Sequence, residues 1–314
     1  MAIQISSDGR TFTLQTEKSS YQMMADAHDV LLHLYYGRKI AAENLEERIF
    51  RSDVGFAGNP PEAGEDRTYS LDVLPQELPG SGVGDYREDM VRLYHADGSC
   101  AADFRFESYE VQEGAYRIPG LPAAYDTDEE KGETLVITMR ETASAVKVKL
   151  YYGVFEKENC LTRTVCMRIK ERKQSYWIRR FPAMSISSLE TWDLVYFEGR
   201  HAMERIPERV PVRHAKVEIG SIRGTSSHQY NPAMILCDPA ATEDFGSCYG
   251  FCFAYSGNFV AGAQKDQRGL TRVQMGINPT QFRYTLAAGE AFFTPQVLMS
   301  YSSEGFTGLT HSVS

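Results

Sequence analysis

The feature that most constrains the fold is a series of short segments in which apolar and polar residues alternate. Residues 146–150, Val-Lys-Val-Lys-Leu, alternate strictly, so both valines and Leu150 face one side and both lysines face water. Similar runs occur at residues 11–16, 30–36, 134–139, 161–169, 216–222, 251–255, 271–277, 282–286 and 296–301. Turn residues separate them at short intervals. This pattern predicts an all-β protein, a large antiparallel β-sandwich with few short helices.

A few local signals refine this prediction. The pairs Asp8-Gly9 and Asp97-Gly98 are typical of hairpin turns. Helical periodicity is rare: residues 41–48 are expected to make about two helical turns, and a further helix is expected to begin near Thr307. No repeat of fixed period and no clear interdomain linker divides the chain. We therefore expect one very large sandwich, or two that are tightly joined.

Residues 51–87, which we call the arm, interrupt the strand pattern. Glycine and proline recur every few residues, so neither a helix nor a long strand is compatible with this segment. A solvated tail is disfavoured, since the segment and its start carry many large apolar side chains: Phe50, Phe56, Tyr69, Leu71, Leu74, Leu78 and Tyr86. We expect an ordered surface loop that presents charged residues to a partner, namely Asp53, Asp66, Arg67, Asp85 and Arg87.

Composition excludes several classes of function. The chain has 314 residues and a formal net charge of -9, which argues against nucleic acid and against an anionic membrane as partner. No run approaches the length of a membrane helix, and the N-terminus lacks the features of a secretory signal. The six cysteines lack metal-ligand spacing, so we expect free thiols, no metal, no cofactor and a cytoplasmic location. The basic run 163–180 is expected to be a solvated sheet face.

Motifs for nucleophilic, nucleotide-dependent or zinc hydrolysis are absent from the sequence. The seven histidines are scattered. His28 and His33 are expected on opposite faces of one strand, which makes joint metal ligation improbable. Each histidine is therefore predicted to be structural.

Two further segments are unusually polar. Residues 196–205 hold Arg200 and His201, and residues 221–232 hold Arg223, His228 and Asn231. We expect Arg223, Ser226, Ser227, His228 and Asn231 to form a hydrogen-bonded network that braces their loop, with direct ligand contact as the alternative. Asp85, Arg87, Arg200 and His201 are assigned the same bracing or assembly role.

The joint order of many short motifs is more specific than any one of them. They are Asp53, Asn59-Pro60, 66–72 (Asp-Arg-Thr-Tyr-Ser-Leu-Asp), 74–77 (Leu-Pro-Gln-Glu), 84–87 (Gly-Asp-Tyr-Arg), 120–123 (Gly-Leu-Pro-Ala), 199–202 (Gly-Arg-His-Ala), Glu204-Arg205, 223–229 (Arg-Gly-Thr-Ser-Ser-His-Gln), Asn231-Pro232, 249–251 (Tyr-Gly-Phe), 255–259 (Tyr-Ser-Gly-Asn-Phe), 275–279 (Met-Gly-Ile-Asn-Pro) and 295–297 (Pro-Gln-Val). Over essentially its whole length the sequence resembles the N-terminal region of the α-galactosidases of glycoside hydrolase family 36.

The resemblance implies a β-supersandwich over residues 1–305 and, over 306–314, the start of a linker helix toward a (β/α)8 catalytic barrel that this chain does not contain. In that family the barrel supplies two aspartates that hydrolyse terminal α-1,6-galactosides, such as melibiose and raffinose, with retention. The chain itself would hold no catalytic residue. Residues 191–194, Thr-Trp-Asp-Leu, are similar to one barrel motif, but Trp192 and Asp193 are expected to be structural.

The resemblance also assigns roles on the arm. Asp53 and Arg67 would hydrogen-bond galactose hydroxyls in the barrel pocket of the same or a neighbouring subunit of a homotetramer. Some relatives carry tryptophan where this chain has Glu198 and Met203, so no aromatic contact is expected there. Two alternatives stay open: a free-standing galactoside-binding module, and a purely structural assembly domain.

Overall fold

The computed structural model describes residues 2–53, 55, 59–169, 176–180, 182–188 and 190–310. Within these ranges the regular structure is nearly all antiparallel β-strand, as the alternating sequence pattern predicts. The only helices in this part of the chain are two single 3-10 turns, η1 (Glu46–Arg48) and η2 (Pro61–Ala63), and α1 (Gly305–Thr310). The strands form four sheets.

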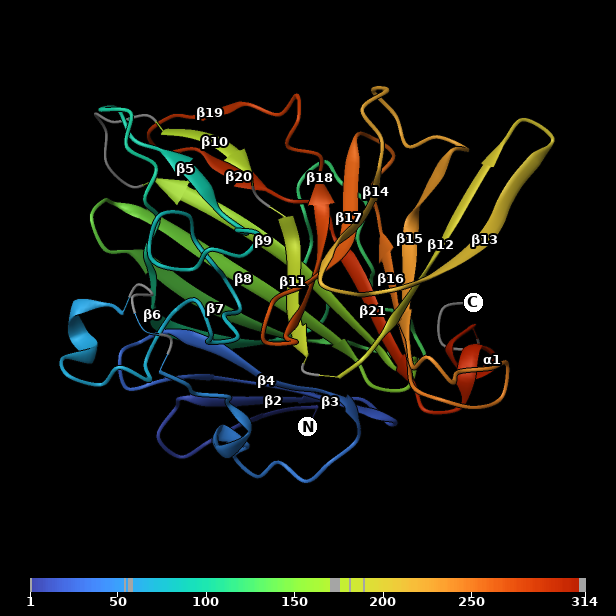
Figure 1. Ribbon diagram of the computed structural model, residues 1–314, viewed down its shortest axis with the longest axis horizontal. Helices are drawn as coiled ribbons and strands as arrows, with labels where there is room; N and C mark the ends of the chain where they lie inside the picture. Colours follow the sequence, from blue (N-terminus) through green and yellow to red (C-terminus); the bar gives the residue numbers. More distant parts are fainter. Residues whose placement is uncertain are drawn as a thin grey trace.

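The first sheet is a simple meander at the N-terminus. Its four strands follow in chain order: β1 (Ile3–Ile5), β2 (Thr11–Gln15), β3 (Ser19–Ala25) and β4 (Leu31–Arg38). The turn at Asp8-Gly9 joins β1 to β2 as expected, and Gly9 has a positive φ of 70° that glycine adopts without strain. Figure 1 shows this sheet (blue) lying beneath the larger sheets.

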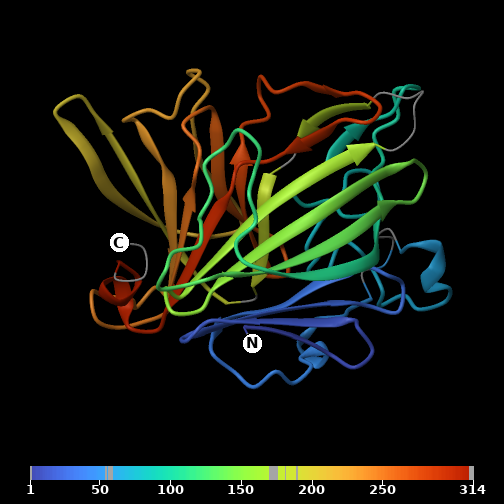
Figure 2. The same ribbon diagram turned by 180° about the vertical axis from the view of Figure 1, so that it is seen from behind.

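The second sheet has ten strands and is strongly curved (Figure 2). Its strands, in spatial order, are β13 (Met203–Pro211), β12 (Asp193–Arg200), β15 (Tyr230–Cys237), β16 (Cys248–Phe253), β21 (Val297–Ser302), β9 (Cys160–Ile169), β8 (Val146–Phe155), β7 (Glu133–Glu141) and β6 (Phe104–Glu113), with β20 (Ala291–Phe293) also paired to β9. Strand β8 follows the alternation exactly as its sequence predicts: Val146, Val148 and Leu150 are buried, whereas Lys147 and Lys149 are partly exposed.

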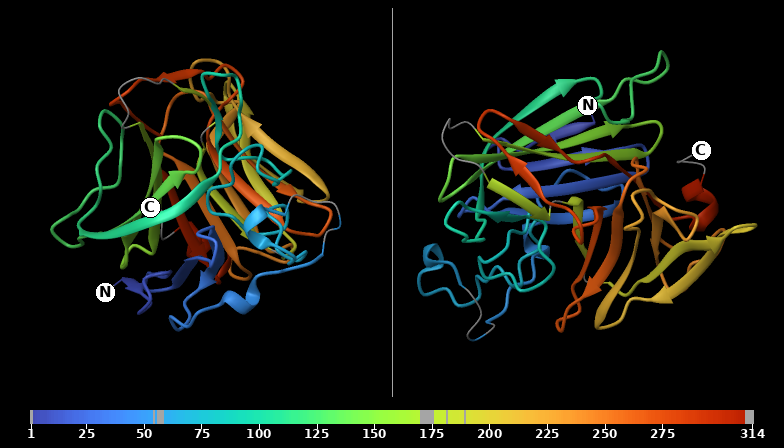
Figure 3. Two further views of the ribbon diagram at one scale, coloured as in Figure 1. Left: turned by 90° about the vertical axis from the view of Figure 1, so that its left-hand side faces the viewer. Right: turned by 90° about the horizontal axis from the view of Figure 1, so that it is seen from above.

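Two smaller sheets complete the fold. One contains β11 (Pro182–Ser188), β18 (Thr271–Ile277), β17 (Phe259–Lys265) and β14 (Ala215–Gly220), and the other contains β19 (Tyr284–Leu286), β10 (Tyr176–Arg180) and β5 (Arg92–Tyr94). Strand β11 packs against β9, and β17 packs against β15, so the four-stranded sheet lies against the curved ten-stranded sheet. The right-hand view of Figure 3 shows the four-stranded sheet and the ten-stranded sheet from above.

A continuous apolar core joins the sheets. It runs from Phe12 and Tyr21 in the first sheet through Leu150 and Trp192 to Met275 in the four-stranded sheet, all of them almost completely buried. Burial of an aromatic or aliphatic side chain of this size stabilises the folded state by roughly 1.5–3 kcal/mol. The shared core therefore fixes the positions of the sheets relative to one another.

Several local predictions were wrong. Residues 41–48 form only the 3-10 turn η1 rather than two helical turns, because Leu45 alone among them packs on the core. Asp97-Gly98 forms a turn, but β5 pairs with β10 instead of entering a hairpin. His28 lies in the turn before β4, so it does not share a strand with His33.

The C-terminal part of the described chain ends in α1, close to where a helix was expected. The boundary at residue 305 between a sandwich and a linker stays a prediction, and residues 311–314 lie outside the described chain. None of the helices in the described ranges has the length and apolar character required to cross a membrane.

Candidate functional site

The arm divides into an exposed outer part and a buried inner part. In the outer part, residues 51–68, most described side chains are exposed, whereas Tyr69, Leu71, Leu74 and Leu78 of the inner part are almost fully buried. Phe56, one of the apolar residues on which the loop prediction rested, lies outside the described residues. The inner part thus anchors the arm through its apolar side chains, as expected of an ordered loop.

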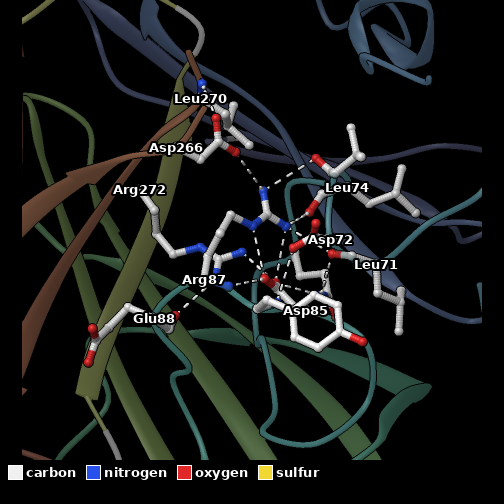
Figure 4. A network of polar contacts seen from close by, with 12 residues as sticks. Leu71, Asp72, Leu74, Asp85, Arg87, Glu88, Asp266, Leu270 and Arg272 are labelled. Carbon is white, nitrogen blue, oxygen red and sulfur yellow. Dashed lines mark hydrogen bonds and ion pairs between the residues drawn. The ribbon is translucent and has the colours of Figure 1, made fainter. Parts of the chain in front are cut away.

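Arg87 is the centre of a buried polar network in the inner part (Figure 4). Its guanidinium donates to the carbonyl oxygens of Leu71 and Leu74, each at 2.9 Å, and to that of Val73 at 3.4 Å. It also forms a two-pronged ion pair with Asp85, at 2.9 and 3.1 Å. One planar cation near the end of the inner arm therefore holds the backbone of residues 71–74 near its start.

Asp85 extends this network to the four-stranded sheet. Its Oδ2 accepts from Nη2 of Arg272 on β18 at 2.6 Å and from Nε2 of Gln76 at 3.0 Å. Burial would raise the pKa of Asp85, but Arg272 and Arg87 outweigh this effect and hold the pKa at about 2. Asp85 is therefore ionised at neutral pH, and it links the arm to β18.

Glu77 attaches the inner arm to the other sheets. Its Oε1 accepts from Tyr21 on β3 and lies 2.9 Å from Nδ1 of His33 on β4. Its Oε2 accepts from Tyr152 on β8 at 2.8 Å and pairs with Nη1 of Arg163 on β9 at 3.0 Å. Glu77 and Arg163 have no exposed side-chain surface at all. A single carboxylate thus joins the arm to four strands.

The electrostatics of Glu77 favour its charged form. Burial opposes ionisation, but the neighbouring Arg163 and the contact with His33 lower its pKa to about 2. The Arg163 Nη2 also donates to the backbone carbonyl of Glu77 at 2.8 Å. Arg163 was expected in a solvated basic face, and this was wrong: it occupies an inward position of β9, where only a buried anion can compensate its charge.

At the outer part of the arm, Asp53 and Arg67 form an exposed pair. Arg67 Nε lies 3.2 Å from Asp53 Oδ2, and Arg67 Nη2 donates to Asp53 Oδ1 at 3.2 Å. The exposed fractions of the two side chains are 48% for Asp53 and 66% for Arg67. The structure therefore brings together the two residues that the sequence singled out, and it leaves both accessible.

The neighbouring backbone also holds this pair in place. Asp53 Oδ1 accepts from the Gly55 N–H at 2.8 Å, and Asn59 Nδ2 donates to the Asp66 carbonyl at 3.1 Å. Asp66 caps its own turn by accepting from the Thr68 N–H and hydroxyl. The carboxylate accepts hydrogen bonds and the adjacent guanidinium donates them. Because both groups are exposed to solvent, the pair is suited to bind hydroxyl groups.

The other polar segments are less connected than expected. Arg200 and His201 lie at the exposed end of the β12–β13 hairpin, where Arg200 Nη2 contacts only Met203 Sδ, at 3.2 Å, within the described chain. Arg223 donates to Gln229 at 2.9 Å rather than to His228 or Asn231, and the buried Oδ1 of Asn231 has no partner among the residues described. The predicted network among the residues of 221–232 was therefore wrong in its members.

Trp192 and Asp193 have structural contacts. Trp192 is buried and its indole N–H donates to Ser188 Oγ at 3.1 Å. Asp193 pairs with Arg209 at 2.8 Å across the β12–β13 hairpin.

The six cysteines are free thiols. The described residues contain no group of three or more His, Cys, Asp and Glu side chains that are placed to hold a metal ion.

Comparison with known proteins places this architecture in one family. The model of the glycosyl hydrolase family 36 N-terminal domain matches residues 29–287. The bifunctional alpha-galactosidase/sucrose kinase AgaSK of Mediterraneibacter gnavus is 45% identical over 99% of this chain and 33% of its own length. Alpha-galactosidase AgaA of Geobacillus stearothermophilus is 35% identical over 99% of this chain and 42% of its own.

Solved structures agree with these sequence matches. The galactosidase domain of AgaSK superposes with a TM-score of 0.95 at 44% identity, covering 99% of this chain and 43% of that one. The alpha-galactosidase AgaB of Geobacillus stearothermophilus superposes with a TM-score of 0.93 at 36% identity, covering 99% and 42%. The chain thus spans between a third and about two-fifths of the length of these curated relatives.

Proposed function

Because the chain belongs to the glycosyl hydrolase family 36 N-terminal domain family, we propose that it is the non-catalytic N-terminal part of an α-galactosidase. The relatives named above are α-galactosidases, and the chain matches only part of each. In this proposal the (β/α)8 barrel and its catalytic carboxylates lie in a part of the enzyme other than this chain. The complete enzyme hydrolyses terminal α-1,6-galactosides such as melibiose and raffinose in the cytoplasm.

The observation that carries a role in substrate binding is the accessible Asp53–Arg67 pair on a firmly anchored arm. Both side chains are exposed in this chain. Together the carboxylate and the guanidinium offer several hydrogen-bond acceptors and donors that a ligand can reach. We infer that these groups exchange their mutual contact for galactose hydroxyls when the arm meets a catalytic barrel of the same or a neighbouring subunit. Neither residue takes part in bond cleavage.

Asp85 and Arg87 have the bracing role in this proposal. Their network is buried and lies at the base of the arm, so it positions Asp53 and Arg67 without touching substrate. Arg200 and His201 at the end of the β12–β13 hairpin, together with Arg223, His228 and Asn231, are proposed as assembly surface for a homotetramer. Four of these five side chains are exposed, all except the half-buried Asn231, and exposed polar side chains are suited to such a contact.

Two measurements test the proposal. The purified chain of 314 residues, incubated with raffinose or with p-nitrophenyl α-galactoside, is expected to release no product. Release of galactose at a rate above the uncatalysed one would contradict the non-catalytic assignment. The substrate contact is tested by the kinetics of the Asp53→Asn variant in the complete enzyme.

A further inference from the structure

The ten-stranded sheet begins and ends in two edge strands, β13 and β6, which lie at opposite ends of the sheet in Figure 1. An edge strand presents backbone N–H and C=O groups that the sheet itself does not use, and these groups pair readily with another chain. Proteins commonly protect such an edge with proline or with a covering loop. The hydrogen bonds of the sheet show which residues of each edge point their backbone groups outward.

Strand β13 is blocked against further pairing. The Val212 N–H donates to the Trp192 carbonyl at 2.9 Å, so these two residues form a hydrogen-bonded pair. Because such pairs alternate along an antiparallel ladder, residues 207, 209 and 211 direct their backbone groups away from β12. Two of these three residues are Pro207 and Pro211, and proline lacks the N–H that an added strand requires.

Strand β6, in contrast, keeps its outward donors. The Gly114 N–H donates to the Gly132 carbonyl at 2.8 Å, at the end of the ladder between β6 and β7. By the same alternation, the backbone groups of Tyr109, Val111 and Glu113 point away from β7. The strand contains no proline, so all three of these N–H groups are present.

Within the described ranges this edge of β6 is covered only at its start. The Phe106 N–H donates to the carbonyl of Asp29, in the turn before β4, at 2.7 Å. Every residue of 107–113 is exposed, and the exposed fractions of the apolar residues Tyr109 and Val111 are 41% and 43%. The open part of the edge is therefore a row of backbone donors and acceptors with accessible apolar side chains beside it.

The sequence of this edge is complementary to itself. When two copies are aligned antiparallel with Val111 facing Val111, Tyr109 faces Glu113 and Glu110 faces Gln112. No two carboxylates then lie directly opposite each other, an arrangement that would be destabilising. Within one chain Gln112 Nε2 already donates to Glu110 Oε1 at 2.9 Å, so amide and carboxylate are compatible on this face. Each facing pair of outward-pointing residues can exchange two backbone hydrogen bonds.

We propose that two copies of this chain associate through their β6 strands, paired antiparallel with the two-fold axis at Val111. The contact is isologous and closed, because both copies use the same groups and neither β6 strand keeps a free edge. It joins the two ten-stranded sheets into one continuous sheet. The proposal does not depend on the proposed function, and it uses neither the arm nor the end of the β12–β13 hairpin.

Sedimentation velocity of the 314-residue chain at increasing concentrations tests the association. A concentration-dependent dimer is expected at about 0.15 M salt, where screening weakens the repulsion between two copies of net charge -9. Val111→Pro removes an outward N–H but no hydrogen bond of the sheet, so the fold is expected to persist and the dimer dissociation constant to rise about tenfold or more.

Two further variants at the same position control for an effect on folding. Val111→Lys keeps the N–H but places like charges opposite each other, and it is expected to weaken the dimer as well. Val111→Thr keeps both the N–H and the β-branched shape, and it is expected to leave the dissociation constant within about threefold of wild type. Circular dichroism of all three variants checks that the strands are retained.

Cross-linking tests the register. With diamide as oxidant, Val111→Cys is expected to form a covalent dimer, because directly opposed residues of a hydrogen-bonded pair have Cα atoms about 5.5 Å apart, within reach of a disulfide. Gln112→Cys faces Glu110 of the second copy instead of itself and is expected to cross-link no more than wild type, whose six free thiols give the background.

Three results would overturn the proposal. The first is a chain that stays monomeric at all concentrations, which would leave the open edge to a different partner. The second is a dimer that neither Val111→Pro nor Val111→Lys weakens, because the copies would then associate through another surface. The third is equal cross-linking of the Val111→Cys and Gln112→Cys variants, which the proposed two-fold axis does not allow.

Discussion

Glu77 and Arg163, separated by 86 positions in the sequence, form an ion pair of 3.0 Å in which neither side chain is exposed. Glu77 belongs to the arm and Arg163 to the ten-stranded sheet. This pair, together with Asp85 and Arg272, converts a proline-rich segment with almost no regular structure into a fixed support for two exposed charged residues.

Removing the charge of Glu77 is expected to destabilise the fold strongly. Glu77→Gln leaves Arg163 charged and buried without its anion, a situation that typically costs about 3–5 kcal/mol. Urea unfolding of wild type and variant measures the difference. The double variant Glu77→Gln, Arg163→Met is expected to recover part of the loss, because it removes the uncompensated charge. A Glu77→Gln protein as stable as wild type would contradict this account of the pair.

Stability is expected to fall steeply on acidification. The pKa values of Glu77 and Asp85 are about 2 in the folded chain, below their ordinary values of 4.5 and 3.8. A carboxyl whose folded pKa is lowered stabilises the fold above its unfolded pKa, and this contribution is lost as pH decreases toward the folded pKa. The free energy of unfolding should therefore decrease between about pH 5 and pH 2. The Asp85→Asn variant should show a shallower decrease of the unfolding free energy with falling pH. A slope identical to that of wild type would contradict the lowered pKa of Asp85.

Arg87 is expected to be irreplaceable by lysine. Lysine retains the charge but lacks the planar fork that reaches Asp85 and the carbonyls of Leu71 and Leu74. Arg87→Lys should lower stability by about 1–3 kcal/mol and should expose the arm to limited proteolysis within residues 51–68. Arg67→Lys is the matched control, since Arg67 is exposed, and it should leave the cleavage rate of the arm unchanged.

The Asp53–Arg67 pair should matter little for folding. Both side chains are more than 40% exposed, and ion pairs of this kind contribute about 0–1 kcal/mol. Thermal unfolding of Asp53→Asn and Arg67→Ala should therefore resemble that of wild type. A large loss of stability in either variant would mean that the pair braces the arm rather than serving a partner.

The fold was largely predictable because its strands alternate, but particular strands were not. Residues 146–150 and 271–277 identify β8 and β18 directly. Strand β3 was missed because all seven of its residues are buried, polar ones included, and so its sequence shows no alternation. Strand β13 was missed for the opposite reason, since nearly all of it is exposed. Residues 41–48 were expected to make about two helical turns, although they lack an apolar face that packs.

The site was predictable in part. The arm and its exposed pair follow from turn residues and from a resemblance, whereas the buried charges do not follow from local sequence. The one local signal for Arg163 was its inward position in the run Leu161, Arg163, Val165, and its partner Glu77 lies far away in the chain. His33 was predicted to be structural, but its partner Glu77 is 44 positions away and is seen only in the fold. Ionic partners that are far apart in the chain can be identified only from the three-dimensional structure.

We propose that the arm delivers Asp53 and Arg67 to a galactoside. The most direct test is steady-state kinetics of Asp53→Asn in a complete α-galactosidase that carries this chain, with raffinose as substrate. Loss of charge-assisted hydrogen bonds to substrate predicts that kcat/KM falls about tenfold or more, mainly through KM, while the melting temperature stays unchanged. Values of kcat and KM equal to those of the wild-type enzyme would contradict the claim.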